Sequence, residues 1–286
     1  MTEEFVTAHF PRNHLIEFGG LPVVEFTQTA ATTDLRAELA DAVGAGHQLL
    51  QPSQESARLS AALADPGSVA WWLEFNPENT CASDAFAVYL DRFLATARTE
   101  PVTALVVGGH IEMGTEPQAV VDALVERRDR FPNLRALFLS EIDDDQISDV
   151  DDTAVGALAM AFPNLRELTV CLTGGTNFDP IEHSGLRRLV WYSDCLYPEV
   201  IASIAGSELP ALEYLELWNG ETFAESREES EHAAFEALCH TTTLPRLHHL
   251  GLRGFTFAEE IAAQLAGTPL RRQLTALRLD TVDQRG

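Results

Sequence analysis

A short leucine pattern recurs along most of this chain, and it limits the possible folds more than any other feature. The pattern is L-x-x-L-x-L, with Val or Trp accepted at an outer position. It occurs at residues 102–107, 134–139, 165–170, 186–191, 212–217, 247–252 and 274–279. Four copies carry a proline two residues before the first leucine, as in Phe131-Pro-Asn-Leu134. Seven copies in sequence order indicate a structural repeat of roughly 20–29 residues with loop insertions.

Segments with helical periodicity lie between the copies, at residues 115–131, 149–162, 197–206, 230–240 and 257–267. Strand followed by helix, several times over, predicts an α/β fold with a parallel sheet and the helices on one side of it. Side chains alternate along a strand, so we expect the leucines to face the helices and the residues between them to face the other side.

The phrases Phe131-Pro-Asn-Leu-Arg135 and Leu209-Pro-Ala-Leu-Glu-Tyr-Leu215 resemble the leucine-rich-repeat superfamily. They are most similar to an uncharacterised bacterial cytoplasmic family, related to the repeat region of proteins that carry a WGR domain. The resemblance covers about residues 100–286 and extends more loosely upstream. It implies an α/β leucine-rich-repeat solenoid, with a curved parallel sheet on the concave side and helices on the convex side. It also implies protein recognition and no known reaction.

One position departs from that family. The asparagine expected three residues after the last strand leucine is replaced by His110, Ile142, Thr173, Asp194, Gly220, Phe255 and Val282. Of these, only Asp194 could imitate the bonds that the asparagine makes to neighbouring backbone. We therefore expect no continuous asparagine ladder and a less regular curvature.

The repeats divide the chain into two parts. Residues 101–286 are predicted to form the solenoid, with about seven repeats. Residues 1–100 contain no good copy and are predicted to be an irregular segment and cap, with strands at 21–26 and 69–75 and a helix at 83–97. Few residues follow the seventh copy, so a C-terminal cap is expected to be missing. Either the chain is shorter than its relatives or something covers that end, and self-association through it is one possibility.

Charge excludes several kinds of partner. The net charge is −25 and the basic residues are all arginine. Such a chain repels nucleic acid and anionic lipid, so neither nucleic acid nor membrane is expected as a partner. The sequence also lacks an apolar stretch long enough to span a membrane, and its acidic start leads us to expect no secretory signal. The four cysteines are widely spaced, which indicates reduced thiols. These features together predict a cytoplasmic protein.

No combination of residues predicts catalysis, a cofactor or a metal. His248 and His249 with Glu213 or Glu216 could form a metal site, and the acidic run 143–152 could bind calcium, but neither has the usual ligand spacing. Cys171 has no histidine aligned with it by repeat register. The chain is therefore expected not to be an enzyme. The alternatives are a regulatory subunit acting in trans on an enzyme and an enzyme with an unrecognised site.

The repeat register predicts which residues face a partner. Arginines follow the first leucine in three successive copies, at Arg135, Arg166 and Arg187. Aromatic and arginine side chains dominate protein interfaces. The predicted protein-binding patch consists of Arg187, Arg188, Tyr192, Tyr214, Trp218, His249 and Arg253. In the alternative interpretation, these arginines pair with glutamates on adjacent strands and the aromatic rings pack under loops. The prediction is a non-catalytic scaffold that binds a protein of unknown identity.

Overall fold

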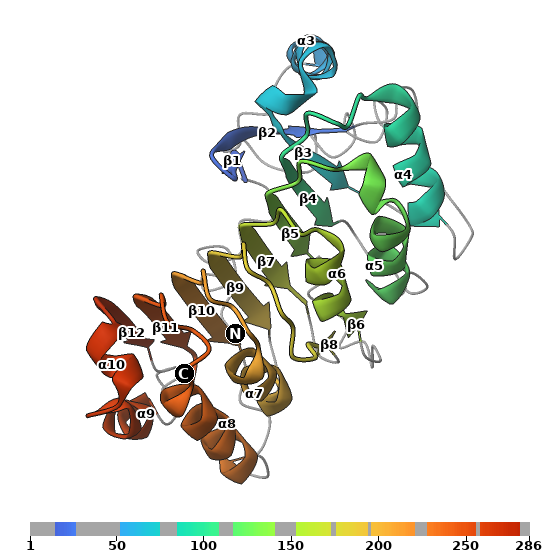
Figure 1. Ribbon diagram of the computed structural model, residues 1–286. Coiled ribbons are helices and arrows are strands. Elements are labelled where there is room, and N and C mark those ends of the chain that lie inside the picture. The colour runs from blue at the N-terminus through green and yellow to red at the C-terminus, as the bar shows by residue number, and fades with distance from the viewer. Residues whose placement is uncertain are drawn as a thin grey trace.

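One open sheet of ten strands is the main feature of the computed structural model (Figure 1). The structure describes residues 15–26, 52–74, 85–108, 117–140, 153–172, 176–193, 196–220, 228–255 and 258–280. Among these residues, the strands follow one another in the order β1-β2-β3-β4-β5-β7-β9-β10-β11-β12. β1 and β2 are antiparallel, and every later neighbouring pair is parallel.

The sheet strands are short and nearly equal in length. They are β1 (Glu17–Phe18), β2 (Leu21–Glu25), β3 (Ala70–Glu74), β4 (Ala104–Gly108), β5 (Ala136–Ser140), β7 (Glu167–Cys171), β9 (Arg188–Ser193), β10 (Tyr214–Asn219), β11 (His249–Arg253) and β12 (Ala276–Asp280). A separate two-stranded sheet pairs β6 (Thr153–Ala154) with β8 (Thr176–Asn177).

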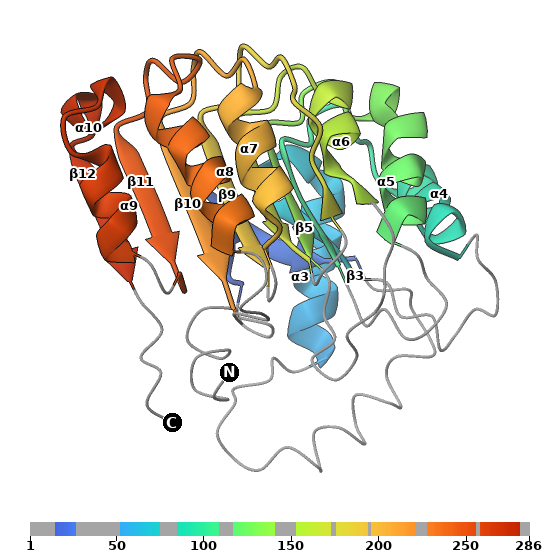
Figure 2. The ribbon, with the colours of Figure 1, turned by 90° about the horizontal axis from the view of Figure 1, so that it is seen from below.

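Helices lie in the connections, and most of them cover one face of the sheet, as Figure 2 shows from below. They are α3 (Pro52–Ala64), α4 (Ala85–Thr96), α5 (Pro117–Glu126), α6 (Val155–Ala161), α7 (Pro198–Gly206), α8 (Glu228–His240), α9 (Ala258–Leu265) and α10 (Pro269–Gln273), with 3-10 turns η1 (Pro66–Ser68) and η3 (Arg128–Arg130). We call the sheet face away from α4–α9 the open face. None of the described helices is long and apolar enough to cross a membrane.

The structure confirms the α/β class and the alternation of strands with helices. α5 to α9 fall within or close to the segments with helical periodicity, α4 falls within the helix expected at 83–97, and all seven L-x-x-L-x-L copies overlap a strand of the sheet. The sheet also continues upstream of residue 100, because β2 and β3 pair in parallel with each other and β3 pairs with β4. The division into residues 1–100 and 101–286 therefore stays a prediction, and one continuous sheet crosses it.

The leucines of the repeat share one core on the helix side. Neighbouring strands align their central leucines in register, and each of these side chains is at most 1% exposed: Leu137, Leu168, Leu189, Leu215 and Leu250. The residues two places later in each strand are also buried. Burying a leucine stabilises a fold by about 1.5–3 kcal/mol, so the repeat is what holds the sheet to its helices.

The proline-containing phrases form the same turn each time. The N–H of the first repeat leucine donates to the carbonyl three residues earlier, in Phe131–Leu134, Phe162–Leu165, Leu209–Leu212 and Leu244–Leu247. In two turns an asparagine side chain also donates to the preceding repeat: Asn133 to the Glu100 carbonyl at 2.8 Å, and Asn164 to the Pro132 carbonyl at 2.9 Å. These bonds tie successive repeats together at the start of their strands.

One asparagine does bond to a neighbouring turn, at a position that the sequence analysis did not consider. The Oδ1 of Asn219 accepts a hydrogen bond from the Leu196 N–H at 3.0 Å, and Asn219 is 4% exposed. A bond of this kind was expected only at Asp194, which lies outside the described residues. Asn219 comes two residues after the last strand leucine, and not three. At this position, β10 places the side chain beside the turn that follows β9.

The open face has two chemically different halves. Over β3, β4 and β5 it is apolar, and a second cluster contains Phe18, Val23, Ala70, Ala104, Val106 and Ala136. The β1–β2 turn lies directly on this half: a Cβ added at Gly19 would come 2.9 Å from the Ala136 Cβ and 3.2 Å from the Ala104 Cβ. We call this the apolar half, and the part over β7, β9, β10, β11 and β12 the polar half.

Candidate protein-binding surface

Three rows of side chains cross the polar half at right angles to the strands. Residues 167, 188, 214 and 249 are register partners in the first row. Residues 169, 190, 216, 251 and 278 form the second row, and residues 171, 192, 218, 253 and 280 form the third. This arrangement follows from two-residue alternation combined with an unbroken register over five strands.

The first row is a stack of planar groups. The Arg188 guanidinium lies 3.8 Å from the centre of the Tyr214 ring. On its other side, the Tyr214 ring stacks on His249 with centroids 3.9 Å apart and planes 6° apart. Arg188 is held from the next strand by Glu167, whose Oε1 lies 3.1 Å from Nε. A cation over an aromatic ring is stabilised by the ring's negative face, so the row fixes all three side chains.

The third row repeats this chemistry. The Arg253 guanidinium lies 3.7 Å from the centre of the Trp218 ring, and the Tyr192 ring lies on the other side with centroids 5.1 Å apart. Arg253 is held in turn by Asp280, with Nε and Oδ2 2.7 Å apart. Two cation–aromatic rows thus run side by side across neighbouring strands.

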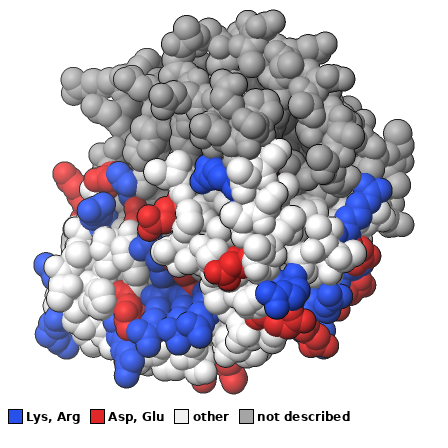
Figure 3. All heavy atoms as spheres, turned by 90° about the horizontal axis from the view of Figure 1, so that it is seen from above, with Lys and Arg blue, Asp and Glu red and all other residues white. Residues whose placement is uncertain are grey.

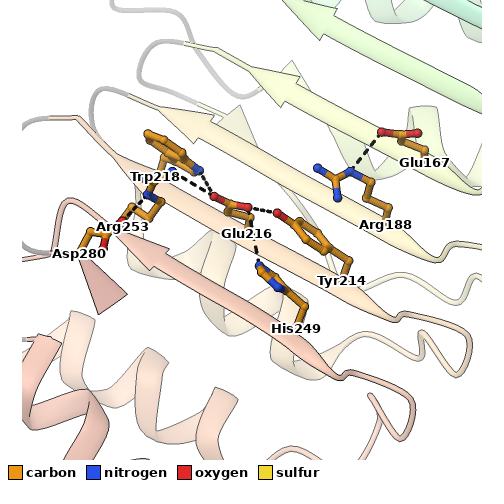
Figure 4. A network of polar contacts seen from close by, with 8 residues as sticks. All are labelled: Glu167, Arg188, Tyr214, Glu216, Trp218, His249, Arg253 and Asp280. Carbon is orange, nitrogen blue, oxygen red and sulfur yellow. Dashed lines mark hydrogen bonds and ion pairs between the residues drawn. The ribbon is translucent and has the colours of Figure 1, made fainter. Parts of the chain in front are cut away.

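Glu216 lies between the two rows and joins them (Figure 4). Its carboxylate accepts hydrogen bonds from the Tyr214 hydroxyl and from Trp218 Nε1, the latter at 2.9 Å. It also accepts a longer bond from Arg253 Nη1 at 3.4 Å. His249 Nε2 is 3.8 Å away, within ion-pair range but too far for a hydrogen bond. Glu216 is 5% exposed, and a buried carboxylate persists only with such partners.

Gly251 makes room for this carboxylate. It is the register partner of Glu216 on β11, and a Cβ there would come 2.9 Å from Glu216 Cγ and 3.2 Å from Cδ. A side chain at position 251 would therefore displace Glu216 from the position in which it reaches both rows.

Burial alters the acid–base behaviour of the surface. It raises the pKa of Tyr192 to about 12. It also raises the pKa of Tyr214, whose hydroxyl is kept protonated by its bond to Glu216 as well. Burial raises the pKa of Glu167 despite the opposing effect of Arg188, and it lowers the pKa of His249 despite the opposing effect of Glu216. Near neutral pH both phenols are therefore protonated and His249 is mainly uncharged.

The structure brings six of the seven predicted patch residues together. Those six are Arg188, Tyr192, Tyr214, Trp218, His249 and Arg253. Arg187 belongs to none of the three rows; it comes just before β9 and pairs with Glu213 at 3.6 Å. Whether the patch binds a protein stays a prediction.

The alternative interpretation also describes part of what the structure shows. Arg188 and Arg253 each pair with a carboxylate on an adjacent strand, as that interpretation required, and Arg187 pairs with Glu213 just before one. Trp218 is 5% exposed and His249 is 9% exposed. These two rings support their neighbours, and Arg188, Tyr192, Tyr214 and Arg253 provide more of the accessible surface.

The predicted patch left out the acidic residues and the glycine that organise it. Glu167, Glu216 and Asp280 hold the cations and hydroxyls, and Gly251 leaves the space. The repeat register places these residues on the same face as the predicted ones, but it does not show the contacts that they make.

Neither metal site that was considered from the sequence is supported by the described residues. Among the described residues, no group of three or more His, Cys, Asp or Glu side chains is placed to hold a metal ion. The acidic run 143–152 lies outside the described residues. Cys171 and Cys239 are not in disulfide bonds, and burial raises the pKa of the Cys239 thiol to about 11.

Comparison with solved structures shows a relative of the fold. The chain is similar to a crystal structure of a Bacteroides fragilis protein, with a TM-score of 0.57 and 20% sequence identity. The match covers 78% of this chain and 66% of that protein, so this chain spans slightly less than two thirds of its length. At this identity the similarity shows the fold alone. No family model matches the chain, and a search of curated proteins finds no match either.

Proposed function

We propose that this chain is a non-catalytic, protein-binding scaffold of the leucine-rich-repeat type, a curved cytoplasmic solenoid that recognises a partner with the polar half of its open face. The observation that carries the proposal is the pair of cation–aromatic rows joined by Glu216. Tyr, Trp and Arg supply most of the binding energy in protein interfaces, because they bury large areas and keep polar groups for hydrogen bonds.

Preorganisation supports this function. Binding normally costs about 0.5–1.5 kcal/mol for each flexible side chain that becomes fixed. Here Arg188 and Arg253 are already held by stacking on one side and by a carboxylate on another. A partner would therefore meet side chains that have little freedom left to lose.

Two further features support the class of scaffold. The repeated turns and the shared leucine core are what a leucine-rich-repeat solenoid requires. Cys171 and Cys239, which are not in disulfide bonds, fit a reducing compartment. The net charge of −25 favours a protein over nucleic acid as the partner.

The test is quantitative binding after the partner has been identified by affinity purification. The purified partner is titrated by calorimetry against the wild-type chain and against Arg188→Ala/Tyr192→Ala. The control is Arg128→Ala/Met160→Ala, which removes an exposed arginine and an exposed apolar side chain away from the open face. We expect binding at least tenfold weaker for the open-face variant and unchanged for the control. Equal affinities for both variants would contradict the proposal.

A further inference from the structure

Three arginines occupy neighbouring positions immediately before β5, β7 and β9. Their backbones are joined directly: the Arg166 N–H donates to the Arg135 carbonyl at 2.7 Å, and the Arg187 N–H donates to the Arg166 carbonyl at 2.8 Å. All three side chains are exposed. We call Arg135, Arg166 and Arg187 the arginine edge. Its members are one strand spacing apart, about 4.8 Å.

The arginine edge is short of negative partners. Arg187 pairs with Glu213, and the nearby Glu167 carboxylate is engaged by Arg188. Within the part of the chain that the structure describes, no carboxylate forms an ion pair with Arg135 or Arg166. The sequence has 44 acidic residues and 19 basic ones, so two adjacent cations without a carboxylate partner among the described residues are unexpected.

The local charge therefore has the opposite sign to the charge of the whole chain. Seen from above, arginines gather into one contiguous area with single carboxylates at its margins (Figure 3). Like charges at strand spacing repel one another, and an anionic ligand would relieve that repulsion. The guanidinium is a planar fork whose donors match the two oxygens of a carboxylate. At physiological salt, charges farther than about 8 Å are largely screened, so the distant acidic residues interfere little.

We propose that the arginine edge binds an acidic segment, rich in Asp and Glu, of the protein partner. The inference rests on the proposed function, since it gives the chemistry of part of that partner. The edge adjoins the first row through Arg187 and Arg188, which are consecutive in the chain, so one partner can contact both. A short acidic segment fits better than nucleic acid, because a long polyanion would extend over the rest of a chain with net charge −25.

The experiment uses the full chain and a fluorescently labelled octamer of glutamate, with binding followed by anisotropy at low and at physiological salt. The test variant is Arg135→Ala/Arg166→Ala. The matched control is Arg58→Ala/Arg271→Ala, which removes two exposed arginines on α3 and α10 and leaves the same net charge. We expect the wild type and the control to bind alike, the test variant to bind at least tenfold more weakly, and all binding to weaken with salt.

Other outcomes overturn the inference. They are no binding of the peptide to the wild type, and equal binding by test variant and control. Tighter binding of a single-stranded oligonucleotide of the same charge through the same arginines would identify nucleic acid instead. Association of the wild type that the test variant abolishes, measured by light scattering, would identify a second copy of the chain. Peptide binding does not require Tyr192, so loss of partner binding in Arg188→Ala/Tyr192→Ala is a separate result that tests the proposed function alone.

Discussion

At the scale of single residues, Glu216 determines how the polar half is arranged. Removing a carboxylate from water is unfavourable unless hydrogen bonds and positive charge replace the lost hydration. Tyr214, Trp218 and Arg253 supply them here. The same contacts fix the orientation of those three side chains. A residue that offers little surface of its own therefore controls the shape of the surface around it.

Adding a methyl group at Gly251 should show how tightly Glu216 is held. Gly251→Ala places a Cβ 2.9 Å from Glu216 Cγ, so we expect unfolding in urea to require about 1–3 kcal/mol less free energy than in the wild type. In a Glu216→Ala background the obstacle is gone, and the same substitution should be neutral or stabilising. Equal effects of Gly251→Ala in the two backgrounds would show that the two residues do not interact.

His249 should make stability depend on pH. Its pKa in the folded chain is lowered by burial, whereas unfolded histidine has a pKa of about 6.5. As the pH falls below about 6.5, the unfolded state therefore binds the proton first, and the free energy of unfolding decreases until the lowered pKa is reached. His249→Phe keeps an aromatic ring beside Tyr214 and should remove this part of the decrease. His248→Phe is the control for loss of an exposed imidazole, and NMR titration measures the pKa directly. A pKa of His249 above 6.5 would contradict the prediction.

The sequence predicted which residues share the open face, but not how they contact one another. Strand alternation and repeat register are enough to place Arg188, Tyr214 and His249 in one row. The exposure of Trp218 depends on how Tyr192 and Arg253 pack over it, and that is decided by side-chain rotamers. The sequence also did not predict that Glu216 joins the two rows, because an acidic residue between two strand leucines usually faces solvent.

At the scale of elements, periodicity predicted the repeated strands and helices well and the N-terminal ones less completely. Strands near β2 and β3 were expected, and so was a helix near α4. The position of the β1–β2 turn on the apolar half was not, because it depends on contacts between residues far apart in the sequence. The alanines at 70, 104 and 136 were the available sign, since small side chains in successive strands allow close approach of another backbone.

Two adjacent glycines in the β1–β2 turn provide a matched pair of substitutions. Gly19 and Gly20 both have positive φ, 58° and 74°, so alanine at either should cost about 1–2 kcal/mol through backbone strain. At Gly20 a Cβ meets nothing within 4 Å, whereas at Gly19 it contacts the Ala136 and Ala104 Cβ atoms. Gly19→Ala should therefore destabilise more than Gly20→Ala in urea unfolding and should speed hydrogen exchange in β2. Equal destabilisation would show that the turn does not rest on the sheet.

At the scale of the whole molecule, the two edges of the sheet differ. One edge is the two-residue strand β1, which is too short to pair strongly with another chain. The other edge within the described residues is β12, a five-residue strand. Ala276 donates to the His248 carbonyl and the Asp280 carbonyl accepts from Gly254, so the backbone groups of Leu277 and Leu279 point away from β11. This edge is where the chain would pair with a second copy.

Self-association through β12 can be tested without changing the open face. We expect the mass measured by light scattering to rise with concentration for the wild type and for Leu277→Ala. The mass should stay at the monomer value for Leu277→Pro, because proline removes the outward-pointing backbone N–H. Leu277→Ala is the control, since it also removes the leucine side chain but retains that N–H. A constant monomer mass for the wild type at high concentration would rule out this association.

The β1–β2 turn also has a consequence for the size of any complex. Because it occupies the apolar half, an approaching molecule has five strands available, a width of about 19 Å at 4.8 Å per strand spacing. With strands about 17 Å long, the footprint on the sheet is roughly 300 Å², well below the approximately 800 Å² that each side of a typical stable complex buries. A tightly held partner must therefore extend past the strands onto the neighbouring turns.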